Sequence, residues 1–235
     1  MVDECDKMLE TQSMRPMVMQ VIKKTPPNKQ MMMTSATIGE YTRKDASELM
    51  HNCVVVAVDE RALVLEGMRQ FYVSLTEKGK FSRVVHLLDK LPYNQVIVFV
   101  NRVEKAKALA DLLAMRMFQP ICIHSALPQM ERIRLYDHFK VNGSRIMVAT
   151  DLFGRGIDIE RINLVINYDF PPDHETYLHR VGRAGRFGTG GLAISFLSLE
   201  EDRAHDEATL AAVQDRFRVK VQPLPKEMEY LPANH

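Results

Sequence analysis

The chain has no tryptophan, only three cysteines and almost no excess of charge of either sign. Cys5, Cys53 and Cys122 lie far apart, which excludes a disulfide framework and a CxxC zinc site and favours a reducing compartment. With 31 lysines and arginines against 30 acidic residues, the formal net charge is +1. This balance excludes a uniformly basic protein that wraps nucleic acid, so any phosphate binding must come from a local cluster of charge.

Long apolar runs are absent as well. No stretch approaches the roughly 18 residues that a membrane-spanning helix requires, so no transmembrane helix is expected. The N-terminal residues Met1–Asp6 are acidic and do not resemble a signal peptide. The eight histidines show no metal-ligand spacing. The composition therefore predicts a globular protein without a membrane partner.

Short apolar runs alternate with helical patterns along the chain. Strands are expected at Met31–Met33, Val54–Val58, Val73–Leu75, Val96–Val100, Ile121–Ile123, Ile146–Ala149, Leu164–Asn167 and Leu192–Leu197. Helices are expected at Phe81–Lys90, Val103–Ala114, Gln129–Lys140, Pro171–Arg180 and Ser198–Phe217. The strand candidates are continuously apolar, as parallel strands buried on both faces are. The pattern predicts an α/β fold, a parallel sheet flanked by crossover helices.

A charged cluster at Asp59–Arg61 and a glycine at Gly67 predict a domain boundary. Residues 69–222 then hold enough strand–helix units for a complete domain, with residues 59–68 as the linker. Residues 1–58 contain only two expected helices and two or three expected strands, too few to close a core, so they are interpreted as the end of a larger domain. Residues 223–235 contain prolines and no periodicity, and are expected to form a loosely ordered tail.

The strongest local signal is His179–Arg186, in which Arg180, Arg183 and Arg186 recur every three residues with glycines between them. Arginine forks grip phosphate oxygens at two points, and glycine lets the backbone approach closely. Such arginines can stabilise the charge that develops on a transferring phosphoryl group. The alternative is a solvated basic helix end, where cations suit the helix dipole.

The segment Thr150–Asp158 follows the expected strand Ile146–Ala149. Open α/β sheets bind their ligands just beyond the carboxyl ends of strands. Asp158 can therefore hydrogen-bond a ribose hydroxyl or pair with an arginine. The alternative is a tight turn with one structural ion pair.

Three further places have open interpretations. Asp3 and Glu4 can hold Mg²⁺ through water and orient an attacking water, or they can be acidic residues at a helix N-terminus. Ser35 and Thr37 can link a carboxylate to a neighbouring domain, or cap a helix. Arg132, in the first turn of an expected helix, can reach a nucleic-acid phosphate or be an exposed structural arginine.

Together these segments resemble the motifs of the DEAD-box RNA helicases of superfamily 2. The matching segments are Asp3–Asp6 in a DECD form, Ser35–Thr37, Val98–Val100, Ala149–Asp158 and His179–Arg186. In its DECD form, this motif is similar to the one found in the subgroup of these helicases that serves nuclear mRNA splicing and export. The resemblance implies a RecA-like parallel sheet, the helicase C-terminal domain, preceded by a remnant of a first RecA-like domain.

The resemblance also implies site residues. Asp3, with Mg²⁺ held through water, and Glu4 would serve the attacking water, and Arg183 and Arg186 would act as arginine fingers toward ATP. The implied nucleotide-binding residues are Gly156, Asp158, Arg183 and Arg186. The implied RNA-binding residues are Arg132, Thr150 and Gly156. The residues implied in coupling nucleotide state to domain closure are Ser35, Thr37, His179 and Arg180.

The expected function is that of an ATP-dependent RNA helicase acting on single-stranded or duplex RNA. The expected setting is the nucleus, with mRNA splicing or export factors as partners and a monomeric chain. No GxxxxGK[ST] phosphate loop occurs in the sequence, so the chain by itself is expected to be inactive. The alternative hypothesis is a non-catalytic module that binds RNA or a partner protein.

Overall fold

The computed structural model of the chain describes residues 1–10, 13–35, 39–50, 52–56, 67–151, 159, 161–185 and 190–225. The chain divides into two compact units, Met1–Glu60 and Arg61–His235.

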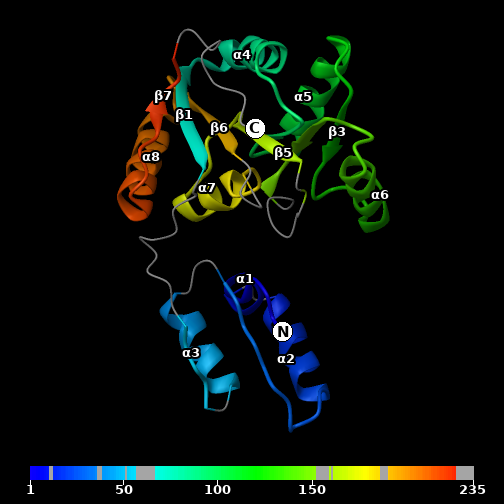
Figure 1. Cartoon of the computed structure of the whole chain (residues 1–235), viewed down its shortest axis with the longest axis vertical. Helices are drawn as coiled ribbons and strands as arrows, with labels where there is room; N and C mark the ends of the chain where they lie inside the picture. The colour runs from blue at the N-terminus through cyan, green and yellow to red at the C-terminus, as the bar shows by residue number, and fades with distance from the viewer. Residues whose placement is uncertain are drawn as a thin grey trace. The chain divides into compact units, whose positions relative to one another are not determined.

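The described residues of the first unit form three helices, α1 (Cys5–Glu10), α2 (Met14–Lys24) and α3 (Glu40–Leu49) (Figure 1). Val2 and Met33 form an isolated parallel bridge. In this bridge the Val2 N–H donates to the Met32 carbonyl at 2.8 Å, and the Thr34 N–H donates to the Val2 carbonyl at 3.0 Å. The strand predicted at Met31–Met33 is therefore wrong in extent, because Met33 alone makes a bridge.

The strand predicted at Val54–Val58 is wrong over its described part, residues 54–56. Val54 and Val56 are 86% and 88% exposed. Valine favours strands because its branched side chain packs on a pleated, half-buried surface. Within the described residues no strand pairs with this run, so the valine side chains have no sheet surface on which to pack.

The second unit contains one sheet of seven strands in the order β3-β4-β2-β5-β6-β1-β7, and every neighbouring pair is parallel. Its strands are β1 (Met68–Leu75), β2 (Gln95–Phe99), β3 (Pro120–Ile123), β4 (Ile146–Ala149), β5 (Ile162–Asn167), β6 (Gly191–Ser198) and β7 (Gln222–Pro223). Its helices are α4 (Glu77–Lys90), α5 (Val103–Met115), α6 (Gln129–Lys140), α7 (His174–Val181) and α8 (Arg203–Phe217) (Figure 1). This confirms the predicted α/β fold with a parallel sheet.

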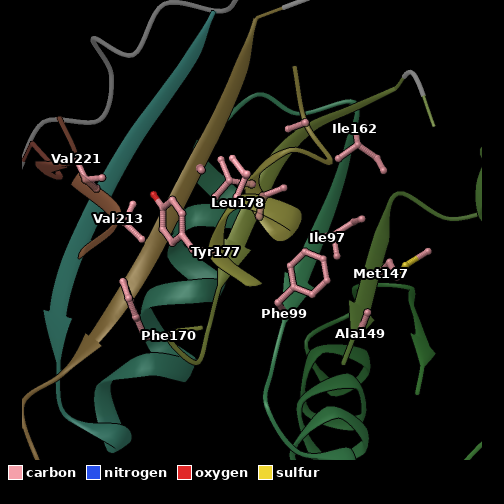
Figure 2. Close-up of a cluster of buried hydrophobic side chains, with 14 of the residues drawn as sticks. Ile97, Phe99, Met147, Ala149, Ile162, Phe170, Tyr177, Leu178, Val213 and Val221 are labelled. Atoms are coloured by element: carbon pink, nitrogen blue, oxygen red, sulfur yellow. The ribbon is translucent and has the colours of Figure 1, made fainter. Parts of the chain in front are cut away.

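Helices cover both faces of the sheet. On one face, α4 and α5 pack on strand residues such as Val96 and Val98. On the other face, α6, α7 and α8 pack on the alternate residues Ile97 and Phe99, and Figure 2 shows part of this second cluster. Because both sides of each central strand are buried, both alternating sets of side chains must be apolar. This explains the continuous apolar runs of the sequence.

Helix α6 and strand β4 agree with the expected bounds at both ends, and β2, β3, β6 and α5 agree within one residue. The expected starts of β1, β5, α4, α7 and α8 are wrong by two to five residues. Helix α7 begins at His174 because the Asp173 side chain caps it, accepting the Thr176 N–H at 2.7 Å. Strand β1 begins at Met68, one residue inside the expected linker. Strand β7 reaches into the expected tail, and the Leu224 N–H donates to the Tyr72 carbonyl at 2.9 Å. Among the described residues, no helix is long and apolar enough to span a bilayer.

Candidate functional site

Polar residues gather where three neighbouring strands of the sheet end. Asn101 comes just after β2, Thr150 and Asp151 follow β4, and Asp169 comes just after β5. Strands β4 and β5 both pair with β2, so these carboxyl ends lie side by side. This is the edge at which open α/β sheets bind their ligands.

The Arg180 side chain joins the three strand ends. It is fully buried, and its Nε and Nη2 donate to the two carboxylate oxygens of Asp151 at 2.5 and 2.7 Å. Its Nη1 donates to the Asp169 carbonyl at 2.9 Å, and Nη2 donates to the Asn101 Oδ1 at 2.7 Å. The guanidinium carbon lies 5.3 Å from the centre of the Phe99 ring.

This arrangement uses the planar fork of arginine, which a lysine ammonium cannot reproduce. The guanidinium holds Asp151 of the β4 loop, Asn101 after β2 and the backbone after β5 against helix α7. The contacts described for Arg180 are all with its own unit. The coupling role expected for Arg180 stays a prediction, and the structure gives it a second role in fixing the edge.

A second cluster of charges supports the first. Asp169 accepts a hydrogen bond from the Asn101 N–H at 3.0 Å and ion pairs from Lys80 at 3.2 Å and Lys105 at 2.7 Å. Both lysines also pair with Glu77 at 2.8 Å. Their ammonium groups lie 5.6 and 5.9 Å from the centre of the Tyr168 ring. Asp169 therefore links helices α4 and α5 to Asn101, whose side chain accepts a hydrogen bond from Arg180.

The pKa values in this cluster follow from its contacts. Burial acts to raise the pKa of Asp169, but the hydrogen bonds from Lys105 and the Asn101 N–H and the nearby ammonium charges outweigh it and hold the pKa below its ordinary value. Burial acts to lower the pKa of Lys105, and its hydrogen bonds to Asp169 and Glu77 outweigh that effect and raise it. Both groups are therefore charged at neutral pH.

The sequence analysis did not single out Asn101, Asp169 or the two lysines. A signal was present, because Asn101 and Asp169 are polar residues just beyond the ends of buried strands, as Thr150 is. The partners of their side chains lie 64 to 89 residues away in the chain, so the pairing itself depends on the fold.

His179 and Arg183 lie at the end of helix α7 and are 8% and 6% exposed. The Nε of Arg183 donates to the His179 carbonyl at 2.9 Å, which fixes the start of the arginine side chain. Arg183 lies in the turn that follows the helix, and Gly185 in that turn has a φ of 70°. This left-handed conformation suits glycine and lets the chain leave the helix sharply.

The ends of β3 and β4 differ from the Arg180 region in how their polar atoms are paired. His124 after β3 and Thr150 after β4 are 4% and 7% exposed, and the Thr150 N–H donates to the Ile123 carbonyl at 3.3 Å. Within the described part of the chain, the Nδ1 of His124, the Oγ1 of Thr150 and the Nε of Arg132 are buried without a hydrogen-bond partner. Buried polar atoms are nearly always paired in proteins, so these three atoms at one edge are candidates for contacts with a ligand.

Asp3 and Glu4 of the first unit directly follow the Val2–Met33 bridge. The Oδ1 of Asp3 accepts the Glu4 N–H at 3.0 Å and the Thr34 hydroxyl at 2.5 Å. Glu4 has a φ of 50°, a conformation that residues other than glycine rarely adopt. Ser35 follows Thr34, so the structure brings the two predicted sites of this unit, Asp3–Glu4 and Ser35, close together.

The carboxylates of Asp3 and Glu4 are oxygen donors, which suit Mg²⁺. Among the described residues, no group of three or more His, Cys, Asp or Glu side chains can hold a metal ion. Magnesium usually keeps several waters and takes phosphate oxygens as ligands, so one or two carboxylates are a sufficient protein contribution. The residues present therefore fit this metal.

Four predicted site residues lie outside the described residues. They are Thr37, Gly156, Asp158 and Arg186.

The chain is similar to known helicases in both sequence and structure. The sequence profile of the helicase conserved C-terminal domain matches residues 79–188. The ATP-dependent RNA helicase uap56 of Schizosaccharomyces pombe is 51% identical over 229 residues, which cover 97% of this chain and 52% of that protein. The chain thus spans about half the length of the curated relatives it matches.

Two solved structures extend the comparison. Dbp5 of S. cerevisiae bound to RNA and ADP BeF3 is 29% identical with a TM-score of 0.86, over 96% of this chain and 59% of that chain. The E. coli DEAD-box protein SrmB, bound to regulator of ribonuclease activity A, is 30% identical with a TM-score of 0.60, over 67% of this chain and 91% of that chain.

The parallel sheet, its two helical layers and the residues at its carboxyl edge define a helicase C-terminal domain of the RecA-like type. The chain belongs to the DEAD-box RNA helicase family, and its sequence is about half identical to uap56 and SUB2 over nearly its whole length.

Proposed function

We propose that this chain supplies the second RecA-like domain, and the end of the first, of an ATP-dependent RNA helicase of the uap56 and SUB2 type. The boundaries proposed are residues 1–58 for the end of the first domain, 59–68 for the linker, 69–222 for the second domain and 223–235 for the tail. The relatives named above are ATP-dependent RNA helicases, which supports this assignment.

One observation carries the proposal. Arg180 ties the ends of β2, β4 and β5 to helix α7, so that the residues matching three helicase motifs are held at one edge. At the same edge, Thr150, His124 and Arg132 each keep a buried polar atom without a partner among the described residues. A rigid edge with unpaired donors and acceptors is suited to bind a ligand without rearranging.

The RNA backbone is the ligand proposed for the unpaired groups. Arg132 can donate to a phosphate oxygen, and the Thr150 hydroxyl can donate to a phosphate or accept from a 2′-hydroxyl. Gly156 is proposed to let the RNA backbone approach the same loop. Contacts of this kind read no bases, so binding is expected to be independent of sequence. The net charge of +1 limits the number of phosphates that can be neutralised, so binding is expected to be weak.

The nucleotide is proposed to meet Arg183 and Arg186 through its phosphates and Asp158 through its ribose. Arg183 begins from a fixed position, because its Nε is held by the His179 carbonyl. Mg²⁺ bound with the nucleotide would neutralise developing phosphate charge. Asp3 is proposed to hold that ion through water, and Glu4 to orient the attacking water. Ser35, Thr37 and His179 are proposed to couple the nucleotide state to the closure of the two domains.

The cellular role proposed is in nuclear mRNA splicing or export, with RNA and the factors of those processes as partners. The sequence identity to uap56 and SUB2 supports this role. The chain is proposed to act as a monomer.

The experiment that tests the function uses two proteins. The first is this chain alone, which should release no measurable phosphate from ATP with or without RNA. The second joins this chain to the part of S. pombe uap56 that it does not match, and should hydrolyse ATP in an RNA-stimulated manner. In the joined protein, Arg183→Ala should lower kcat by about 10³-fold, the scale of other arginine fingers.

Two outcomes would count against the proposal. RNA-stimulated hydrolysis by this chain alone, abolished by Glu4→Gln, would mean that it holds a complete catalytic site. A folded joined protein that binds RNA without hydrolysing ATP would favour the alternative, a non-catalytic RNA-binding module.

A further inference from the structure

A cavity of about 330 Å³ lies at the opposite edge of the sheet, beside the starting ends of β2, β4 and β5. Its lining residues are Asn94, Asn142, Arg145 and Arg161. Asn94 precedes β2, Arg145 precedes β4, Arg161 precedes β5, and Asn142 follows helix α6. None of these residues belongs to the proposed nucleotide or RNA site.

Arg145 is held in place by its surroundings. Its Nε donates to the Asn94 carbonyl at 3.0 Å, and its Nη2 donates to the Tyr93 carbonyl. The guanidinium carbon lies 4.7 Å from the centre of the Tyr93 ring. Two of the five guanidinium N–H groups are used in these bonds, so a fixed fork remains with donors to spare.

Arg161 and Asn142 have fixed backbones and side chains open to a ligand. The Arg161 carbonyl accepts the Gln95 N–H at 3.2 Å, and the Asn142 N–H donates to the Phe139 carbonyl at 2.9 Å. Within the described residues, neither side chain makes a hydrogen bond or ion pair. The cavity thus combines a fixed guanidinium with a second guanidinium and two carboxamides.

Several main-chain carbonyls near this cavity already accept hydrogen bonds. The last carbonyls of α6, at Asp137, His138 and Phe139, accept the N–H groups of residues 141, 143 and 142. The carbonyls of Tyr93 and Asn94 accept from Arg145. Among the described residues that line the cavity, none is a carboxylate. A set of donors with few competing acceptors favours an anion.

We propose that this cavity binds a phosphate group, either free or carried by a small organic molecule. Arginine forks match phosphate oxygens at two points, and the asparagine amides can donate to the remaining oxygens. A second cavity of about 430 Å³ shares Asn94 and Arg145, and its other lining residues are Leu88, Asp89, Leu91, Pro92, Tyr93 and Asn163. An organic group attached to the phosphate would lie against Leu91, Pro92 and Tyr93, on the part of this mixed surface away from the Asp89 carboxylate. The proposal does not depend on the helicase function.

The test is an NMR titration of the full chain with inorganic phosphate, against sodium chloride at matched ionic strength. The probes are the Nε–H signals of Arg145 and Arg161 and the side-chain amide signals of Asn94 and Asn142. These signals should shift and saturate at roughly millimolar phosphate, as expected for a few exposed charge-assisted contacts. A parallel titration with phenyl phosphate identifies the source. Tighter binding with shifts at Tyr93 indicates an organic carrier, and equal affinity indicates free phosphate.

Two variants and a control make the test specific. Arg161→Gln should weaken phosphate binding by about tenfold, and Asn142→Gly by a few-fold, since glycine tolerates the φ of 65° at this position. Arg203→Gln, an exposed arginine paired with Glu207 on α8, should bind as the unchanged chain does. Unchanged spectra elsewhere establish that each variant is folded. Shifts that rise linearly without saturation, or that are equal in Arg161→Gln and Arg203→Gln, would overturn the proposal.

Discussion

Arg180 and Thr150 lie at the same edge of the same sheet and are both buried. The polar atoms of Arg180 are hydrogen-bonded, whereas, within the described residues, the hydroxyl of Thr150 is not. Arg180 makes four hydrogen bonds to Asp151, Asn101 and the Asp169 carbonyl. The Thr150 hydroxyl makes none with the described residues, and neither do Nδ1 of His124 nor Nε of Arg132. An arginine with four of its five N–H groups bonded holds structure together, whereas the unpaired buried atoms are the ones proposed to meet a ligand.

The comparison separates residues that the sequence motifs group together. Arg180 lies in the same segment as Arg183 and Arg186, and Asp151 directly follows Thr150. The Arg180–Asp151 pair fixes the residue that directly follows Thr150, so we expect it to affect RNA and nucleotide only through the shape of the edge. Substitutions in the Arg180 network should therefore lower stability, whereas substitutions of the residues with unpaired atoms should weaken binding.

The largest effect is expected from Arg180→Ala. It leaves Asp151, Asn101 and a carbonyl without their shared donor and opens a cavity, so the free energy of unfolding should fall by about 3 kcal/mol or more. Arg180→Lys should recover only part of this loss, because an ammonium cannot bond both Asp151 oxygens in one plane. Urea unfolding of the variants measures the effect. The exposed control Arg203→Ala should change stability by no more than about 0.5 kcal/mol.

A smaller loss is expected from Asp169→Asn, which keeps the shape of the side chain but removes its charge. Lys80 is 5% exposed and would lose its pair with the buried Asp169 while keeping its pair with the half-exposed Glu77, so the expected cost is about 1–3 kcal/mol at neutral pH. An unaltered free energy of unfolding at pH 7 would show that the charge of Asp169 is not needed.

The same variant tests the pH dependence. The pKa of Asp169 is lowered in the folded state, so its contribution to stability is present above the ordinary pKa of 3.8 and is lost as the pH falls through the lower folded value. The difference between wild type and Asp169→Asn should therefore narrow below about pH 4. Glu77, whose pKa is also lowered, acts in the same direction, and Asp206, whose pKa burial raises, acts in the opposite one; both are present in both proteins and largely cancel. A difference that stays constant down to pH 2 would contradict the charge argument.

The smallest effect on stability, with a clear effect on binding, is expected from Thr150→Val. Valine has nearly the same shape, and the hydroxyl it replaces is buried and unpaired, so stability should be unchanged or slightly increased. Affinity for single-stranded RNA should fall about fivefold, the value of one hydrogen bond. Fluorescence anisotropy and thermal melting measure the two quantities. A loss of stability with unchanged RNA affinity would make Thr150 a structural residue.

Arg132→Gln tests whether another residue with an unpaired buried atom contacts the RNA backbone. If Arg132 contacts a phosphate, the variant should weaken binding to all RNA sequences alike and reduce the dependence of log affinity on log salt by about one unit. Arg134→Gln on the same helix, where Arg134 pairs with Glu131, is the matched control and should leave the slope unchanged.

The sheet could be predicted because its central strands are apolar on both faces. Ile146–Ala149 was recognised for that reason, whereas Val54–Val56 is also apolar throughout and pairs with no strand among the described residues. Propensity alone does not distinguish these two cases, because the difference lies in what covers the run.

For the site, the sequence located Thr150, Arg132 and Arg183 through their motifs. It did not reveal that Arg180 is bonded at four of its five N–H groups, nor that Lys80 and Lys105 meet at Asp169, because these contacts join residues 11 to 89 positions apart. Hydrogen-bond satisfaction is a property of the folded edge, and that property is the basis on which we distinguish structural residues from proposed binding residues.

The central claim is that RNA meets the side of this edge that holds His124, Thr150 and Arg132, and that the hydrogen-bonded Arg180 network only supports that side. The most direct measurement is an NMR map of the backbone amides of this chain during titration with a short single-stranded RNA. The account predicts that the largest shifts occur at His124, Thr150 and the first turn of α6, with little change at Asn101, Asp169 and Arg180. Shifts centred on another face of the domain, or on the Arg180 network with His124 and Thr150 unmoved, would contradict it.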